Sequence, residues 1–303
     1  MKPFEQGISP ALYRRICVVA LWALCAIVVT GAAVRLTGSG LGCSDWPTCE
    51  RDRFVAPWQF NAQVEFINRM LTGVVSIAVI LAVMGSLLRR PRRTDLTRWS
   101  LALVGGVVAQ IIVGAFVTLS GLKYSIVGVH FLLSMVLVWA AVVLVDRAGR
   151  PDDDRGPRTW PSWARAVFAS ALVVLCTGPV VTSAGPHAGS KEVRRLPFDL
   201  STVARIHSLS VWILCAIVAW VAWSHRHDGP TATRRGVIEL LGAIVAQGAL
   251  GYLQYFTGVP AVLVAAHLAG ATVVWVLAVR LALASPAGTP APGHADDARE
   301  LVR

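Results

Sequence analysis

Two histidines buried in apolar sequence are the residues best placed to do chemistry, and each ends a matching block. The first block runs from Gln110 to His130 and the second from Gln247 to His267. In each block, glycines follow the glutamine after four and after eleven residues. Matched positions at identical offsets indicate an internal repeat, so the chain is predicted to consist of two related halves.

A third histidine, His207, is predicted to lie near the start of another apolar span, at a depth similar to that of His267. Two neutral imidazoles on separate helices can bind a haem iron from both faces inside a bundle. The alternative for each histidine is a hydrogen-bonded packing role, although ionisable groups inside a membrane are usually functional. Zinc is disfavoured because no third or fourth ligand accompanies the pair.

The first half departs from this symmetry, because Asn68 stands where His207 stands in the second half. Asparagine is a poor iron ligand, so His130 is the only evident protein ligand of the first site. Glu65 lies one helical turn before Asn68 and on the same face. It is either solvated at the membrane boundary or able to move protons and stabilise positive charge. The residues therefore predict a closed site suited to electron transfer and an open site suited to reaction.

The composition is that of a membrane protein. The chain has 303 residues, of which 55% are hydrophobic and 15% charged. Its net charge of +11 would suit nucleic acid, but the basic residues lie between the apolar runs. The positive-inside rule explains that distribution better, so we expect a lipid bilayer and no nucleic acid as partner.

Eight runs reach the length of about 20 residues that a membrane span needs. They cover approximately 16–36, 64–88, 99–119, 124–145, 162–183, 202–224, 236–256 and 260–284. The first run lacks a cleavage site and is interpreted as a retained span. With four spans in each half, both halves share one orientation. The fold class is therefore predicted to be all-α and integral to the membrane, with two parallel-repeat four-helix bundles.

The distribution of arginine and lysine predicts that both termini are cytoplasmic. The expected organisation is an N-terminal segment at 1–15, a first half at 16–146, a linker at 147–161, a second half at 162–284 and a disordered tail at 285–303. All three histidines then lie near the outer face.

The outer loops carry further candidates. Arg35, Arg69 and Arg205 are placed to pair with haem propionates, or are interfacial arginines whose charged ends reach water. Cys43 and Cys49 lie on the oxidising side, where a disulfide is plausible, either as a structural link or as a redox-active pair. His187 is a loop residue that is either a surface side chain or a proton carrier or haem contact.

These stretches resemble one known family. The segment TGAAVRLTGSGLGCSDWPTC follows the first span, EFINR opens the second, and TSAGPHAG follows the fifth. With the paired glutamine-to-histidine blocks, they are similar to the haem A synthase family over roughly residues 12–284. The loop with its two cysteines is the most specific part. The family's usual E-x-x-H-R pattern is broken here by Asn68.

The resemblance implies an oxidoreductase that oxidises the C8 methyl of haem O to a formyl group, making haem A for terminal oxidases. It implies a haem b cofactor with His207 and His267 as axial ligands, and His130 as a ligand of the substrate haem. Glu65 matches the family's glutamate, and Cys43 with Cys49 match its outer cysteine pair. A haem O synthase or oxidase assembly factors are implied as partners, and the plasma membrane as the location.

Two other functions remain open at this point. A di-haem, quinol-linked cytochrome b would hold two permanent haems and leave Glu65 and the outer cysteines without a role. A haem or small-molecule transporter would need alternating access, whereas the polar sites gather near one face.

Overall fold

The described part of the chain folds into eight long helices, as the sequence predicts. The computed structural model describes residues 7–51, 54–154, 159–190, 193–227 and 229–284. The helices are α1 (Pro10–Leu36), α2 (Phe60–Leu88), α3 (Thr94–Leu119), α4 (Tyr124–Gly149), α5 (Ser162–Ala184), α6 (Leu200–Ser224), α7 (Thr231–Phe256) and α8 (Ala261–Ala284). All eight are long and apolar enough to cross a membrane. The tail predicted to be disordered, 285–303, lies outside the described residues.

Several helices extend beyond the predicted spans. α1 begins at Pro10, α3 at Thr94 and α7 at Thr231, each about one turn or more before the expected apolar run. The added turns carry arginines, which a hydropathy pattern leaves out. They remain helical because arginine can lay its stem on apolar surface while its charged end reaches water. At the start of α1, the Ser9 side chain also caps the helix by accepting from the Leu12 N–H at 3.2 Å.

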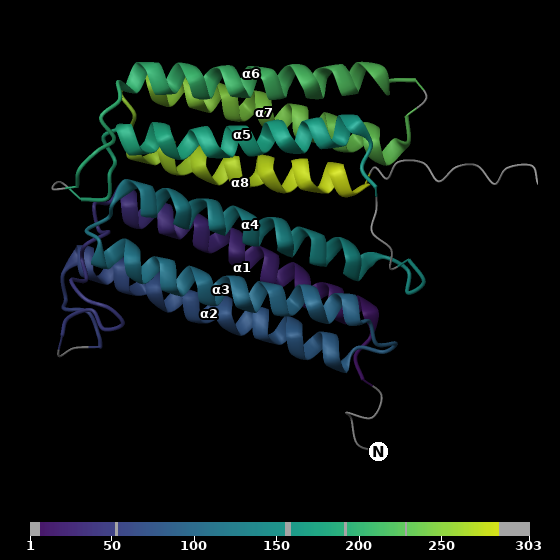
Figure 1. Ribbon diagram of the computed structural model, residues 1–303, viewed down its shortest axis with the longest axis horizontal. Helices are drawn as coiled ribbons and strands as arrows, with labels where there is room; N and C mark the ends of the chain where they lie inside the picture. Colours follow the sequence, from purple (N-terminus) through teal and green to yellow (C-terminus); the bar gives the residue numbers. More distant parts are fainter. Residues whose placement is uncertain (1–6, 52–53, 155–158, 191–192, 228, 285–303) are drawn as a thin grey trace, which may run out of the picture.

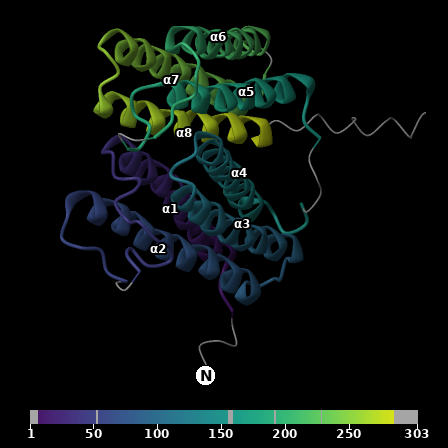
Figure 2. The ribbon, with the colours of Figure 1, turned by 60° about the vertical axis from the view of Figure 1, so that its left-hand side comes forward.

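The helices form two groups of four (Figure 1). α1 packs against α2 and α4, and α3 against α2 and α4; α5 to α8 repeat this ring of contacts. Within the described residues, α2 and α4 therefore face each other across one bundle, and α6 and α8 across the other. Figure 2 shows the two groups separated from another side. Each bundle thus has one pair of opposed helices that do not contact each other directly.

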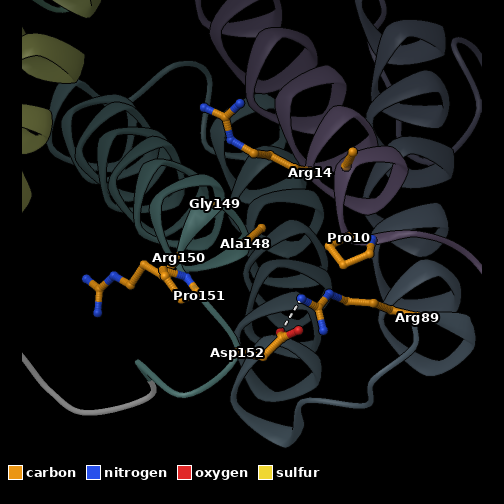
Figure 3. A pocket seen from close by; sticks show the side chains of 9 residues that line it. Pro10, Arg14, Arg89, Ala148, Gly149, Arg150, Pro151 and Asp152 are labelled. Carbon is orange, nitrogen blue, oxygen red and sulfur yellow. Dashed lines mark hydrogen bonds and ion pairs between the residues drawn. The ribbon is translucent and has the colours of Figure 1, made fainter.

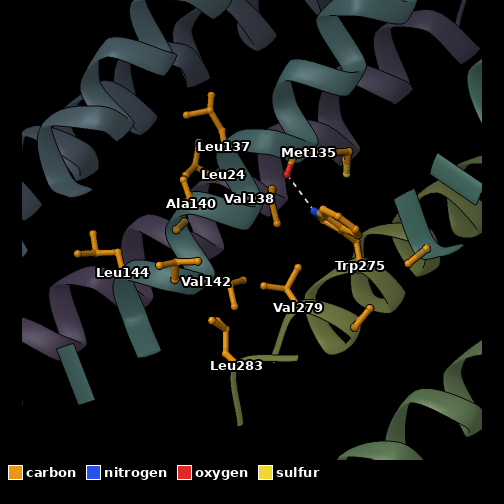
Figure 4. Packing of buried hydrophobic residues seen from close by; sticks show 14 of the residues in the cluster. Leu24, Met135, Leu137, Val138, Ala140, Val142, Leu144, Trp275, Val279 and Leu283 are labelled. Carbon is orange, nitrogen blue, oxygen red and sulfur yellow. Dashed lines mark hydrogen bonds between the residues drawn. The ribbon is translucent and has the colours of Figure 1, made fainter. Parts of the chain in front are cut away.

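The groups meet where α8 packs against α4 and α1. The indole N–H of Trp275 on α8 donates to the Met135 carbonyl on α4 at 2.9 Å, and both residues are buried. Val279 and Leu283 continue the same face of α8 toward Val142 of α4 (Figure 4). One apolar core therefore runs through both halves.

The turns before α4 and α8 have the same backbone conformation. Gly121 and Gly258 have φ values of 64° and 81°, and the residues after them, Leu122 and Val259, both have φ 60°. Glycine adopts this left-handed region without a steric penalty, whereas leucine and valine rarely do. The repeated turn places the histidine-bearing helices α4 and α8 in the same way relative to α3 and α7.

The two ends of the bundle differ in chemistry. One end, here called the disulfide end, carries the loops between α1 and α2, α3 and α4, α5 and α6, and α7 and α8 (left in Figure 1). The other, the arginine end, carries buried Arg89 and Arg93. Arg89 forms an ion pair with Asp152 at 2.5 Å, and Arg93 one with Asp95 at 2.9 Å.

At the disulfide end, Asp199 caps α6 two turns before His207. Its carboxylate accepts from the Ser201 hydroxyl and from the Thr202 N–H, the latter at 3.0 Å. These hydrogen bonds hold the pKa of Asp199 below its ordinary value, so the cap stays ionised at neutral pH. The first turn of α6, and with it the depth of His207, is fixed by this cap.

Replacing Trp275 by phenylalanine is expected to destabilise the protein by about 1 kcal/mol, because the hydrogen bond to Met135 is lost. The matched control is Trp139→Phe, since the Trp139 N–H is buried with no hydrogen-bond partner in the described residues. Thermal unfolding in detergent should therefore show a lower midpoint for Trp275→Phe than for Trp139→Phe. Equal midpoints would mean that the Trp275 hydrogen bond contributes nothing to the joint between the halves.

Candidate functional site

The structure brings the predicted pair His207 and His267 together across the second bundle. Their ring centroids are 6.5 Å apart and the rings are inclined by 77°. They come from α6 and α8, the two helices that face each other across this bundle. Two metal–imidazole bonds of about 2 Å in line would put the ring centroids roughly 6 Å apart. The observed separation therefore matches one metal ion shared between the two rings.

His207 is held by a neighbour on α5. Its Nδ1 lies 2.8 Å from the Thr177 hydroxyl oxygen, and that hydroxyl lies 3.0 Å from the Val174 carbonyl. When the hydroxyl donates to Val174, it accepts from Nδ1–H of His207. This tautomer leaves Nε2 unprotonated, which is the form of histidine that binds a metal, and ligating histidines generally use such a second hydrogen bond.

His267 is packed against a glycine. A Cβ atom at Gly251 would lie 3.0 Å from Cε1 of the His267 ring, closer than side chains tolerate. The Gln247 amide donates to the His267 carbonyl and so joins α7 to α8 one turn below Gly251. Nδ1 of His267 is buried with no hydrogen-bond partner among the described residues. A side chain at 251 would therefore require the His267 ring to shift.

These features fit an axially ligated haem. Two imidazoles face each other at metal-sharing distance, and glycines stand beside both rings, since a Cβ at Gly178 would lie 3.7 Å from the His207 ring. Nitrogen donors on two faces are a known axial set for haem iron. His207 and His267 would hold such a group.

The first bundle repeats these contacts around His130. The Gln110 amide donates to the His130 carbonyl at 3.0 Å and to the Ser134 hydroxyl at 2.6 Å. A Cβ at Gly114 would lie 3.4 Å from the His130 ring. Nδ1 of His130 is buried and has no hydrogen-bond partner within the part of the chain that is described. His130 is therefore placed on α4 as His267 is on α8.

Asn68 on α2 occupies the place that His207 has on α6. The Thr30 hydroxyl of α1 donates to the Asn68 carboxamide oxygen at 2.8 Å, as Thr177 of α5 contacts His207. A Cβ at Gly31, the glycine after Thr30, would meet nothing within 4 Å. Asn68 and His130 thus lie on the opposed helices α2 and α4, as His207 and His267 lie on α6 and α8.

Glu65 is bound into the disulfide loop. It is only 6% exposed, and its two carboxylate oxygens accept from the Cys43 N–H at 2.8 Å and from Arg69 at 2.6 Å. Arg69 also donates to the Asp45 and Thr48 carbonyls at 2.9 and 3.2 Å. The carboxylate is therefore paired rather than solvated, and Arg69 is occupied by protein partners.

The expected disulfide between Cys43 and Cys49 is present, and both cysteines are at most 1% exposed. Its loop surrounds the Glu65–Arg69 pair. A change in the conformation of this loop would therefore alter the hydrogen bonds of Glu65 and Arg69.

The remaining outer candidates join the two halves. Arg35 at the end of α1 donates to the His187 and Thr182 carbonyls at 2.7 and 3.0 Å. His187 in turn contacts the Val259 carbonyl through Nε2 at 2.8 Å. Arg205 is exposed on α6. The propionate contacts expected of Arg35, Arg69 and Arg205 stay predictions.

Thr30 and Thr177 were missed by reasoning from the sequence. Each stands directly before a glycine, as Thr30–Gly31 and Thr177–Gly178, and this repeated dipeptide was the available signal. A threonine inside an apolar run commonly bonds only to its own helix, so its contact with the next helix was not evident.

The arginine end has a separate hollow. A cavity of about 380 Å³ lies between the start of α1 and the ends of α2 and α4, where Arg89 reaches Asp152 below Arg14 (Figure 3). It lies at the opposite end of the helices from the histidines. It does not belong to the site described above.

Replacing Arg69 by alanine is expected to speed reduction of the Cys43–Cys49 disulfide by dithiothreitol at least about tenfold, because hydrogen bonds to a charged group hold the loop shut. Thiol labelling of the full chain over time measures the rate. Arg51→Ala is the control, since Arg51 is exposed on the same loop. A rate that is unchanged in Arg69→Ala would show that the loop is closed by other contacts.

Comparison with known proteins identifies the family of this chain. The family model for the cytochrome oxidase assembly proteins, COX15-CtaA, matches residues 14–279. The protein named "Heme A synthase" from Symbiobacterium thermophilum is 30% identical over 273 residues, covering 76% of this chain and 83% of that protein. The one from Listeria welshimeri is 25% identical, covering 85% of this chain and 90% of that protein.

A shorter match, to the "Heme A synthase" of Exiguobacterium sibiricum, is 24% identical and spans 52% of this chain and 55% of that protein. The family match itself includes all the candidate histidines, both disulfide cysteines and all eight helices in whole or in large part. The chain belongs to the COX15-CtaA family of cytochrome oxidase assembly proteins.

Proposed function

We propose that the two bundles divide the work of a haem A synthase, with haem b bound in the second and haem O oxidised in the first. The chain is a haem A synthase, an oxidoreductase that converts haem O to haem A. The division between bundles is carried by one observation. His207 and His267 face each other at 6.5 Å, whereas the equivalent of His207 in the first bundle is Asn68.

The second bundle holds haem b through His207 and His267. His207 and His267 would both ligate the haem iron, and a haem held by two histidines would supply one-electron transfer rather than bind a substrate. Thr177 keeps the Nε2 of His207 available, and Gly251 gives the His267 ring its place. Arg205, on the same turn as His207, is assigned to a propionate.

The first bundle takes haem O as substrate on His130. Asn68 provides no strong second ligand, so one face of the substrate iron stays open to exchange. Arg35 and Arg69 stand at the disulfide end of this bundle. A weaker second ligand also eases replacement of haem O by the product.

The reaction removes four electrons from the C8 methyl carbon and adds one oxygen atom, by successive hydroxylations followed by loss of water. Protons leave the carbon together with the electrons. Glu65 is the carboxylate nearest the open site along α2, one turn from Asn68, and is assigned to accept protons or to stabilise developing positive charge. Haem b, held by His207 and His267, would supply one-electron transfer from the first site, and an external electron acceptor takes up the four electrons in all.

The paired contacts support a parallel repeat. Thr30 with Asn68 and Thr177 with His207, as well as Gln110 with His130 and Gln247 with His267, are equivalent interactions. We infer a pseudo-twofold axis along the membrane normal that relates 16–146 to 162–284. The disulfide end then faces the outside of the plasma membrane, and both termini are cytoplasmic. Haem O reaches the first bundle from a haem O synthase, and haem A leaves toward oxidase assembly.

Haem extraction and mass analysis of the purified chain test this function. Haem B together with haem O, a hydroxylated haem or haem A is expected. Haem B alone, at two per chain, would instead identify an electron-transfer cytochrome. The histidine variants assign the sites: His207→Ala and His267→Ala should lose haem B, and His130→Ala should lose the haem O series while keeping haem B. Loss of both haems in all three variants would contradict separate sites.

Gly251→Ala is expected to reduce the haem B content and shift its absorption, because the added methyl displaces the His267 ring. Gly248→Ala is the matched control on the same helix, since a Cβ there meets nothing within 4 Å. Haem content per chain and the reduced-minus-oxidised spectrum measure the difference. Identical spectra for the two variants would argue against His267 as a ligand in this position.

A further inference from the structure

We propose that Asn68 is a hydrogen-bond donor to a small ligand on the open face of the haem bound by His130, and that Thr30 positions it for that role. The ligand class is a small molecule or anion with a lone pair on oxygen or nitrogen, such as water, hydroxide or azide. The proposal rests on the proposed function, because it takes His130 as the protein ligand of the substrate haem.

The hydrogen bond from Thr30 decides which end of Asn68 is free. The Thr30 hydroxyl donates to the carboxamide oxygen of Asn68 at 2.8 Å. The carboxamide nitrogen has no hydrogen-bond partner in the described part of the chain. Two N–H donors without an acceptor are costly inside a membrane, where lipid offers none. Asn68 is only half-buried, so its amide is free to donate to a molecule that is not part of the protein chain.

The second bundle indicates where this amide lies. Thr177 contacts Nδ1 of His207, which leaves Nε2 on the side that faces His267. Thr30 contacts Asn68 from the same place on α1, so the free end of Asn68 corresponds to the ligating end of His207. By this correspondence, the amide is directed toward α4, the helix that carries His130.

The difference in side-chain length leaves room for a ligand. Asparagine ends at its δ atoms, whereas a histidine reaches one atom further to Nε2. The His207 ring lies beside Gly178, but a Cβ at Gly31 would meet nothing within 4 Å. The shorter side chain at 68 therefore leaves more room beside the iron of a haem on His130 than an imidazole would. A small ligand on the iron would lie within reach of the Asn68 N–H.

The surroundings do not repel an anion. Glu65, one turn away on α2, is neutralised by Arg69 at 2.6 Å and also accepts from the Cys43 N–H. An Asn68 that only packs α1 against α2 would make the same contact with Thr30. The two roles differ in one measurable property, because only a donor to the ligand changes ligand affinity.

Azide binding to the oxidised full chain, purified and loaded with haem O, distinguishes a donor role of Asn68 from a packing role. Haem b with two histidines offers azide no free position, so the absorbance change reports the first site. Asn68→Leu is expected to weaken azide binding roughly tenfold to a hundredfold, which is the effect of losing a hydrogen bond to a charged group. Thr30→Val should weaken it in the same direction by a smaller factor. Asn68→His should abolish it, because the imidazole occupies the open position.

Ser76→Ala, two turns further along α2, is the matched control and should bind azide as the unchanged protein does. An unaltered haem b spectrum shows that a variant is folded. If Asn68→Leu does not fold, the azide affinity of Thr30→Val tests the proposal in its place. The proposal is overturned if Thr30→Val and Asn68→Leu bind azide as tightly as the wild-type protein does. It is also overturned if the wild-type protein binds no azide. Azide binding that persists in His130→Ala contradicts the assignment of His130, and so the proposed function itself.

Discussion

A polar side chain inside a bilayer must find its hydrogen-bond partner within the protein, and the architecture of both sites depends on this constraint. Thr30 and Thr177 meet it by binding the side chain at the equivalent position of the next helix. Gln110 and Gln247 meet it by binding the carbonyl of a histidine on the following helix. Two polar residues in each bundle therefore fix how its helices are aligned, because a shift by one turn would leave each of them without its partner.

The same scaffold yields two different sites through differences in side chains. Histidine at 207 provides a second nitrogen at 6.5 Å centroid distance from His267, whereas asparagine at 68 ends short of that position. Thr30 and Thr177 hold the two residues from equivalent positions, although Thr30 donates to Asn68 and Thr177 accepts from His207. The asymmetry therefore lies in side-chain chemistry, at position 68 and at Glu65, rather than in the packing of the helices. A closed site and an open site on one scaffold suit a protein that both transfers electrons and alters a haem.

Much of this could be predicted from the sequence. The eight helices follow from apolar length, and the approach of His207 to His267 follows from their matched depth on alternate helices. The disulfide follows from two cysteines in one short loop. The partners of Arg35 and Arg69 could not be predicted, since they are backbone carbonyls of loops distant in sequence. Periodicity and composition carry no information on such contacts. Several predicted helices were also too short. Their first turns contain arginines at the membrane surface, which a hydropathy pattern does not include in an apolar span.

Electron paramagnetic resonance of the oxidised protein, purified with both haems bound, tests the central claim most directly. The account predicts two distinct ferric haems: a low-spin centre with two imidazole ligands at His207 and His267, and a high-spin centre at His130 with an open face. His207→Ala should remove the low-spin signal and leave the high-spin signal in place. Two low-spin centres with paired imidazoles in the unchanged protein would contradict the division into a closed and an open site.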